Sequence, residues 1–162
     1  ADFGIMNSGG IRTTIKKGPI RYRDVLEVLP FSNSVTVAEM NGAELKKYLS
    51  KVALMTQGSG GFAHFSGIKM TVDCKAKDVD INTVGDKPFK LEDNYRFTLP
   101  SYNAAGGNKY PKLKEKARDT GFIDADMLYQ FIKKHDTLDP VDYDRAKDVR
   151  YINSRNSDGC GG

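Results

Sequence analysis

Hydrophobic and polar residues alternate in several short stretches of the chain, which is the spacing of a β-strand with one buried face. The pattern predicts strands over residues 3–6, 34–40, 68–72, 79–84, 95–99 and 149–152. A charged turn at 75–78 separates two of these strands. We therefore expect the strands at 68–72 and 79–84 to pair with each other.

Three other stretches have the spacing of amphipathic helices. They cover residues 24–29, 43–55 and about 123–135. Pro30 ends the first helix, and Asn41 with Glu44 three residues later is typical of a helix start. Strands and helices follow each other without strict βαβ alternation, so the sequence predicts an α+β fold, a mixed β-sheet with packed helices in a single domain.

The ends of the chain suggest its place in a larger protein. The sequence opens directly on a predicted core strand, so we expect a fragment of a larger protein that lacks its amino-terminal part. The domain is predicted to cover 1–153, and the Ser-, Asn- and Gly-rich residues 154–162 are predicted to be a flexible tail.

The composition of the 162 residues is that of an ordinary globular protein, with 39% hydrophobic and 28% charged residues. The net charge of +4 favours anionic ligands only weakly, because 25 basic residues are nearly matched by 21 acidic ones. Cys74 and Cys160 could form one long-range disulfide or remain two free thiols. No apolar run approaches the length of a transmembrane helix.

Familiar catalytic patterns are absent from the sequence. His64 and His135 lack the spacing of metal ligands, and Cys74 has no histidine base beside it. Neither a G-x-S-x-G motif nor a Walker A loop is present. We therefore predict no catalytic residue, no metal ligand and no cofactor in this chain, and we expect a binding function instead.

Two loops that follow predicted strands each contain a Gly-Gly pair. The first is Asn-Ser-Gly-Gly-Ile-Arg at 7–12, and the second is Pro-Ser-Tyr-Asn-Ala-Ala-Gly-Gly-Asn-Lys-Tyr-Pro at 100–111. Glycines allow backbone N–H groups to approach an anion closely, although a Gly-Gly pair alone is more often a simple turn. Gly9 and Gly10 would line such a site, and Arg12 adds a guanidinium fork suited to phosphate.

Aromatic and amide side chains complete a predicted nucleotide site. Phe31 and Tyr102 could stack on the two faces of a base, although core packing is the usual role of a single Phe. Asn7 could bond the base edge, and Asn108 the sugar hydroxyls.

These motifs, together with Val-Leu-Pro-Phe at 28–31, resemble the carboxy-terminal domain of the 5′-nucleotidases and UDP-sugar hydrolases. The resemblance spans residues 2 to about 151. It implies a parent phosphoric ester hydrolase in which a separate amino-terminal metallophosphoesterase domain holds two divalent metal ions and the catalytic residues. This domain would bind the nucleotide, and the fragment alone would be inactive. The resemblance also implies export to the periplasm or cell surface, and neither a nucleic-acid polymer nor a membrane span is expected.

Carried over by motif, the substrate-binding residues would be Asn7, Gly9, Gly10, Arg12, Phe31, Tyr102 and Asn108. This sequence departs from the family pattern at three positions: Ser8 replaces Gly, Tyr102 replaces Phe, and Asn108 replaces Asp. The last change removes a charged acceptor for the ribose hydroxyls. Two alternatives stay open: a stand-alone nucleotide-binding module without catalysis, which Asn108 would fit, and the related 2′,3′-cyclic-nucleotide phosphodiesterase branch, which has similar Gly-Gly-Arg loops.

Overall fold

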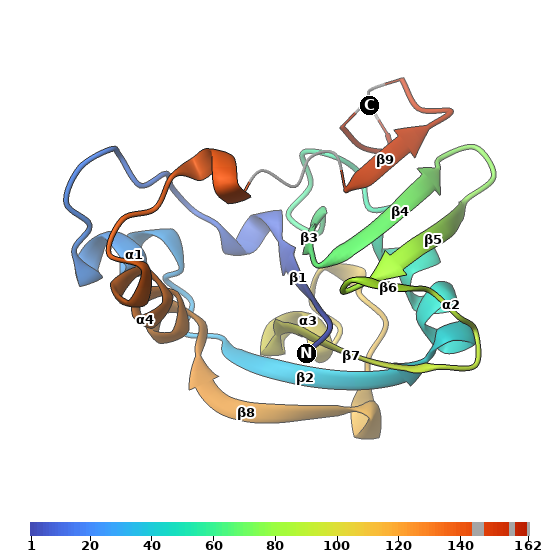
Figure 1. Cartoon of the computed structure of the whole chain (residues 1–162), viewed down its shortest axis with the longest axis horizontal. Coiled ribbons are helices and arrows are strands. Elements are labelled where there is room, and N and C mark those ends of the chain that lie inside the picture. Colours follow the sequence, from blue (N-terminus) through green and yellow to red (C-terminus); the bar gives the residue numbers. More distant parts are fainter. Residues whose placement is uncertain (144–147, 156–157, 162) are drawn as a thin grey trace.

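The computed structural model describes residues 1–143, 148–155 and 158–161 (Figure 1). The strands are β1 (Phe3–Asn7), β2 (Ser34–Asn41), β3 (Ala63–Ser66), β4 (Ile68–Asp73), β5 (Asp78–Val84), β6 (Lys87–Pro88), β7 (Asn94–Pro100), β8 (Ala117–Ile123) and β9 (Val149–Ile152). The α-helices are α1 (Tyr22–Val28), α2 (Gly42–Val52), α3 (Ser101–Ala104) and α4 (Asp124–His135). Single 3-10 turns are η1 (Ser8–Gly10), η2 (Gly107–Lys109), η3 (Lys114–Lys116) and η4 (Pro140–Tyr143).

The strands form two mixed sheets, which confirms the predicted α+β class. The first has the order β3-β1-β7-β2-β8, with β1 parallel to β7 and the other neighbours antiparallel. The second has the order β6-β5-β4-β9. In it β4 and β5 form the predicted antiparallel pair, and β9 runs parallel to β4. The sequence predicted a single mixed sheet, whereas the structure divides the strands between two.

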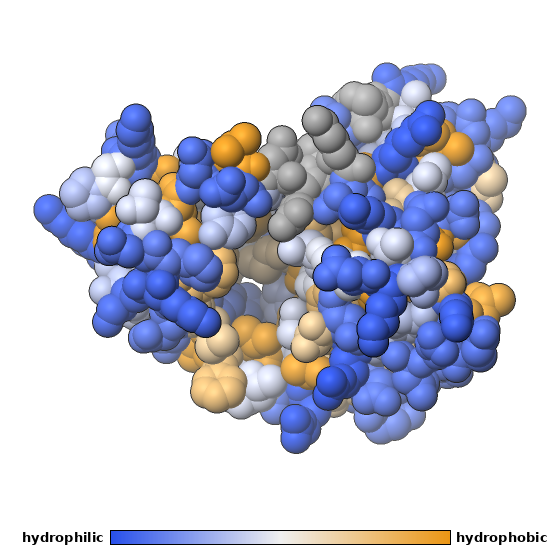
Figure 2. All heavy atoms as spheres, viewed as in Figure 1, coloured by the Kyte–Doolittle hydropathy of each residue, from blue (hydrophilic) through white to orange (hydrophobic). Residues whose placement is uncertain are grey.

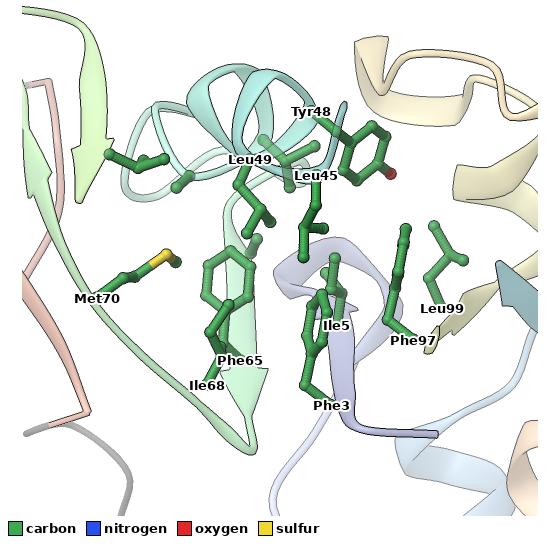
Figure 3. Packing of buried hydrophobic residues seen from close by; sticks show 14 of the residues in the cluster. Phe3, Ile5, Leu45, Tyr48, Leu49, Phe65, Ile68, Met70, Phe97 and Leu99 are labelled. Carbon is green, nitrogen blue, oxygen red and sulfur yellow. The ribbon is translucent and has the colours of Figure 1, made fainter. Parts of the chain in front are cut away.

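The main core is filled by side chains from both sheets and from one face of α2 (Figure 3). Phe97 of β7 is fully buried, and its ring lies 5.0 Å from that of Phe3 and 5.5 Å from that of Tyr48. Leu45 and Leu49 project from α2 into the same cluster. Helix α2 is thus held by its apolar face, as its sequence spacing predicts.

A second, smaller cluster joins α1 and α4, which lie side by side in Figure 1. Its buried members include Val25 of α1 and Ile132 of α4, and Met6 of β1 packs against them. The rings of Tyr22 and Tyr129 meet edge to face at 5.0 Å. This helical pair stands apart from the second sheet, and Figure 2 shows a recess between them.

Local signals at the helix ends are also confirmed. The Asn41 side chain accepts a hydrogen bond of 2.9 Å from the Glu44 backbone N–H at the start of α2. Helix α4 has acidic residues in its first turn and basic residues in its last, which suits the helix dipole. Within the described residues, no helix is both long and apolar enough to cross a membrane.

The two cysteines are joined, which settles the question that the sequence left open. Cys74 and Cys160 form a disulfide with a Cα–Cα distance of 5.4 Å. Cys160 is buried and forms a β-bridge with Thr56. Residues 158–161 of the predicted flexible tail are therefore attached to the body of the domain, whereas 156, 157 and 162 lie outside the described residues. The boundaries 1–153 and 154–162 stay a prediction.

Candidate functional site

The topology of the first sheet brings several loops to one end. Strands β1 and β7 are parallel, so the loops that follow them leave from the same end. Strand β2 begins there, because Val35 pairs with Pro100, and β3 begins there, because Ala63 pairs with Asn7. We call the segments that meet at this end the site loops, namely residues 8–12, 29–33, 57–62 and 101–109. They carry every predicted site residue except Asn7, which is the last residue of β1.

The carbonyl of Gly60 links three of the site segments. It accepts hydrogen bonds from the Asn7 Nδ2 (3.0 Å), the Gly9 backbone N–H (2.9 Å) and the Asn108 Nδ2 (2.9 Å). A Cβ on Gly9 would lie 2.9 Å from this carbonyl oxygen, so the close approach requires glycine. The structure therefore brings Asn7, Gly9 and Asn108 together around a residue that the sequence motifs did not single out.

The hydrogen bond to Gly60 occupies the amide nitrogen of Asn7, which the prediction had assigned to a ligand. Its side chain is 3% exposed and its nitrogen donates within the protein. Asn7 thus stabilises the loop that carries Gly60, and its predicted contact with a base stays a prediction. Gly10 is buried directly behind Asn7 and Met6, where a Cβ would lie 2.7 Å from the Met6 methyl carbon.

Phe31 and Tyr102 are large apolar side chains that remain exposed at this end of the sheet, with 56% and 51% of their surface accessible. Their loops are tied together next to the sheet, because the Ser34 backbone N–H donates to the Ser101 hydroxyl at 3.1 Å. Exposed aromatic rings on adjoining loops form the kind of surface on which a planar ligand can stack. Core packing, the usual role of a Phe, is excluded for Phe31.

The guanidinium of Arg12 lies over the Phe31 ring, 5.8 Å from its centroid, in cation–π geometry. The backbone N–H of Arg12 donates to the Val28 carbonyl at 2.9 Å, which fixes the loop beside the end of α1. The Arg12 side chain is exposed. The structure thus brings a cation and an aromatic ring together at the rim of the site, where an anion attached to a stacked ring could be reached.

The Tyr102 ring rests against the second Gly-Gly pair. A Cβ on Gly107 would lie 2.4 Å from the nearest ring atom, so only glycine leaves room for the observed ring position. In the same loop, Asn103 is fully buried, its Oδ1 has no hydrogen-bond partner, and its Nδ2 lies 3.5 Å from the Gly107 carbonyl. Asn108 adopts a φ of 53°, in the left-handed region that Asn tolerates better than most residues.

For the nucleotide site that the sequence predicts, these contacts imply that Gly107→Ala weakens nucleoside binding about tenfold, near the middle of the range for losing one stacked ring. The added methyl would push the Tyr102 ring from its present position, while the fold should be unchanged. Titration calorimetry with adenosine measures the effect. Ala105→Gly in the same loop is the control, because it removes a methyl from an exposed residue and leaves the ring untouched. Equal affinity in the two variants would contradict the prediction.

Two pairs of polar residues near the site loops were not recognised from the sequence. The Ser8 hydroxyl lies 2.9 Å from the Nε2 of His64, and burial lowers the pKa of this histidine. Asp124, at the start of α4, lines a small pocket between the ends of β1 and β7, and burial raises the pKa of its carboxyl. The Asp124 backbone N–H donates to the Asn33 carbonyl at 2.9 Å. Both pairs depend on strand register, which the sequence does not display.

The chemistry that this arrangement supports is recognition. It combines two exposed rings, one exposed guanidinium, and amide and backbone groups on glycine-rich loops. No group of three or more His, Cys, Asp or Glu side chains that could hold a metal ion occurs in the described part of the chain. Fold and site together define an α+β domain with a ligand-binding end formed by sheet loops.

The chain belongs to the family "5′-nucleotidase, C-terminal domain", whose family model matches residues 1–115. A 5′-nucleotidase of Vibrio vulnificus is 47% identical over 86% of this chain, and protein UshA of Escherichia coli is 39% identical over 93%. These matches cover only 25% and 28% of the two relatives. The crystal structure of a 5′-nucleotidase precursor from Thermus thermophilus superposes on 94% of this chain and 32% of its own, with a TM-score of 0.75 and 30% identity.

Proposed function

We propose that this chain is the nucleotide-binding domain of a 5′-nucleotidase-type phosphoric ester hydrolase and that it holds the base between Phe31 and Tyr102. The observation that carries the proposal is the exposure of these two rings on adjoining loops, where burial would be expected for structural aromatics. Membership of the 5′-nucleotidase C-terminal family supports it.

The other site residues would act around the stacked base. Arg12, which already lies against the Phe31 ring, would bind the phosphate through its guanidinium. Asn7, Gly9 and Gly10 would form the wall of the site behind the Gly60 carbonyl. Asn108 donates to that carbonyl through Nδ2, so its Oδ1 would be the atom that accepts from the ribose hydroxyls.

The parent protein would carry the reaction in a separate amino-terminal domain. Two divalent metal ions there would supply an activated hydroxide that attacks the phosphate ester. The residues of this chain would bind the nucleoside and present the phosphate to that domain, and the chain alone would be inactive. The coverage of about a quarter of the relatives' length supports this arrangement.

We further propose that the parent is exported to the periplasm or cell surface. The Cys74–Cys160 disulfide supports this placement, because structural disulfides persist in oxidising compartments and are rare in the cytosol.

Calorimetric titration of the chain with adenosine, AMP and ribose 5-phosphate tests the proposal. Saturable binding of adenosine, tighter binding of AMP, and much weaker binding of ribose 5-phosphate are expected, because the base supplies the stacking energy. A UDP-sugar in the same series compares a second base. Ribose 5-phosphate binding as tightly as AMP, or no adenosine binding by a sample with a cooperative unfolding transition, would overturn the proposal.

Asn108→Asp is expected to raise the preference for adenosine over 2′,3′-dideoxyadenosine several-fold. A carboxylate offers two charged acceptors to the ribose hydroxyls, and charge-assisted hydrogen bonds are about twice as strong as neutral ones. The variant also loses the Nδ2 bond to Gly60, so the ratio of the two affinities, rather than either alone, is the appropriate measurement. An unchanged ratio would mean that residue 108 does not face the sugar.

A further inference from the structure

The last described residues of the chain pack against the loop that carries Gly60. Cys160 forms a parallel β-bridge with Thr56, and its carbonyl accepts a hydrogen bond of 3.0 Å from the Gln57 backbone N–H. Cys160 is 6% exposed. We call residues 158–161 the C-terminal clip.

The contact between the clip and the loop is close enough to require glycine. A Cβ on Gly159 would lie 2.9 Å from the Gln57 Cβ and 2.9 Å from a ring carbon of Phe62. Gly161, with φ +88°, would bring a Cβ to 2.7 Å from the Thr56 methyl. The clip therefore touches the loop at residues 56, 57 and 62, on both sides of Gly60.

The clip is in turn anchored outside the site. Its disulfide partner Cys74 directly follows β4, and the Cys74 backbone N–H donates to the Ile152 carbonyl of β9 at 3.1 Å. The clip thus connects the second sheet with a loop at the end of the first sheet.

Inside the loop, short-range hydrogen bonds transmit this anchoring to Gly60. The Ser59 N–H donates to the Thr56 carbonyl and the Phe62 N–H donates to the Ser59 carbonyl, both at 3.1 Å. The two bonds fix a tight turn whose exposed middle contains Gly60. The Gly60 carbonyl then receives the donors of Asn7, Gly9 and Asn108.

We propose that the C-terminal clip is a positioning element of the ligand site. The Cys74–Cys160 disulfide holds the clip, and the clip fixes the Gly60 turn in the position where the Gly60 carbonyl accepts hydrogen bonds from Asn7, Gly9 and Asn108. The effect on nucleoside affinity rests on the function proposed above, whereas the effect on the Gly60 turn does not.

Two variants separate the parts of the clip. Gly159→Ala keeps the disulfide and pushes the clip away from Gln57 and Phe62. The double variant Cys74→Ser with Cys160→Ser removes the covalent anchor. Leu45→Ala is the control for general destabilisation, because Leu45 is fully buried in the core on α2 and is not part of the clip.

Hydrogen exchange measured by NMR reports on the turn without any ligand. The Gly9 amide, which donates to Gly60, is compared with the Arg12 amide, which donates to Val28 in the same loop. We expect the protection of Gly9 relative to Arg12 to fall at least tenfold in both clip variants and to stay constant in Leu45→Ala. An unchanged ratio in Gly159→Ala would overturn the proposal even if the double variant does not fold.

Adenosine affinity is then measured in the same proteins. A loss of about tenfold in the clip variants, with no loss in Leu45→Ala, is expected. If the relative protection of Gly9 falls but affinity does not, the clip positions the turn without serving the ligand, and the positioning role in the site is wrong. If the unaltered protein does not bind adenosine, the proposed function fails, while the exchange result still decides the role of the clip.

Discussion

Phe31→Ala is expected to weaken adenosine binding about 5- to 150-fold, since a base stacked on an aromatic ring gains about 1–3 kcal/mol. The ring is 56% exposed, so its removal opens no cavity, and the free energy of unfolding should change by less than about 0.5 kcal/mol. Tyr102→Ala should give a similar loss of affinity. Titration calorimetry and urea unfolding measure the two quantities separately.

Leu91→Ala is the matched control for this prediction. Leu91 is 54% exposed and lies in the turn before β7, at the end of the sheet opposite the site loops. Its replacement should leave both affinity and stability unchanged. The stacking role would be wrong if Phe31→Ala bound adenosine as tightly as Leu91→Ala, or if it lost stability like a core variant.

Removing the disulfide is expected to lower the free energy of unfolding by about 4–5 kcal/mol. The two cysteines are 86 residues apart in sequence, and closing so long a loop takes away much of the entropy of the unfolded chain. The double variant Cys74→Ser with Cys160→Ser avoids a free thiol. Urea unfolding of both proteins without reductant measures the difference. The expected loss is a large share of the free energy of unfolding of about 5–15 kcal/mol that is typical of a domain.

Ser50→Ala is a useful reference in the same unfolding series. Its hydroxyl lies 2.8 Å from the Lys46 carbonyl within α2 and 3.3 Å from the Asp78 carboxylate, and the higher helix propensity of alanine offsets part of its loss, so the change should cost no more than about 1 kcal/mol. A double cysteine variant no less stable than Ser50→Ala would mean that the cross-link does not constrain the unfolded chain as its length implies.

The parts of the fold that were predictable have strong local signals. The spacing of Leu45, Leu49 and Val52 and the Asn41 cap defined α2 within a few residues. The alternation in β4 and β5, separated by a charged turn, defined an antiparallel pair. In both cases the residues that determine the structure are close together in the sequence.

Strand β8 was missed because its sequence has no apolar alternation. It is an edge strand, and only Ala117, Thr120 and Ile123 are even half-buried. Charged residues in and beside it, including Lys116 and Arg118, obscure any strand pattern. The strand is defined by its pairing with β2, which is distant in sequence. The Ser34 hydroxyl, for example, donates to the carboxylate of Asp119, 85 residues further along the chain.

The site likewise combines features with a local sequence signal and features that depend on contacts between distant residues. The Gly-Gly motifs and the rings of Phe31 and Tyr102 could be found in sequence, because they stand in loops directly after predicted strands or after the helix-ending Pro30. The role of Gly60 could not, since its carbonyl meets Asn7 and Asn108 only through the register of β1 with β3 and the shape of a distant loop. The hydrogen bond from Asn7 to this carbonyl was not foreseen, and the contact of Asn7 with a base stays a prediction.

The central claim is that a base lies between the rings of Phe31 and Tyr102. Intermolecular nuclear Overhauser effects between the adenosine H2 and H8 protons and the ring protons of the protein test it most directly. The account predicts cross-peaks to both Phe31 and Tyr102 in the bound state. Saturable binding with cross-peaks to neither ring would place the base elsewhere and contradict the account.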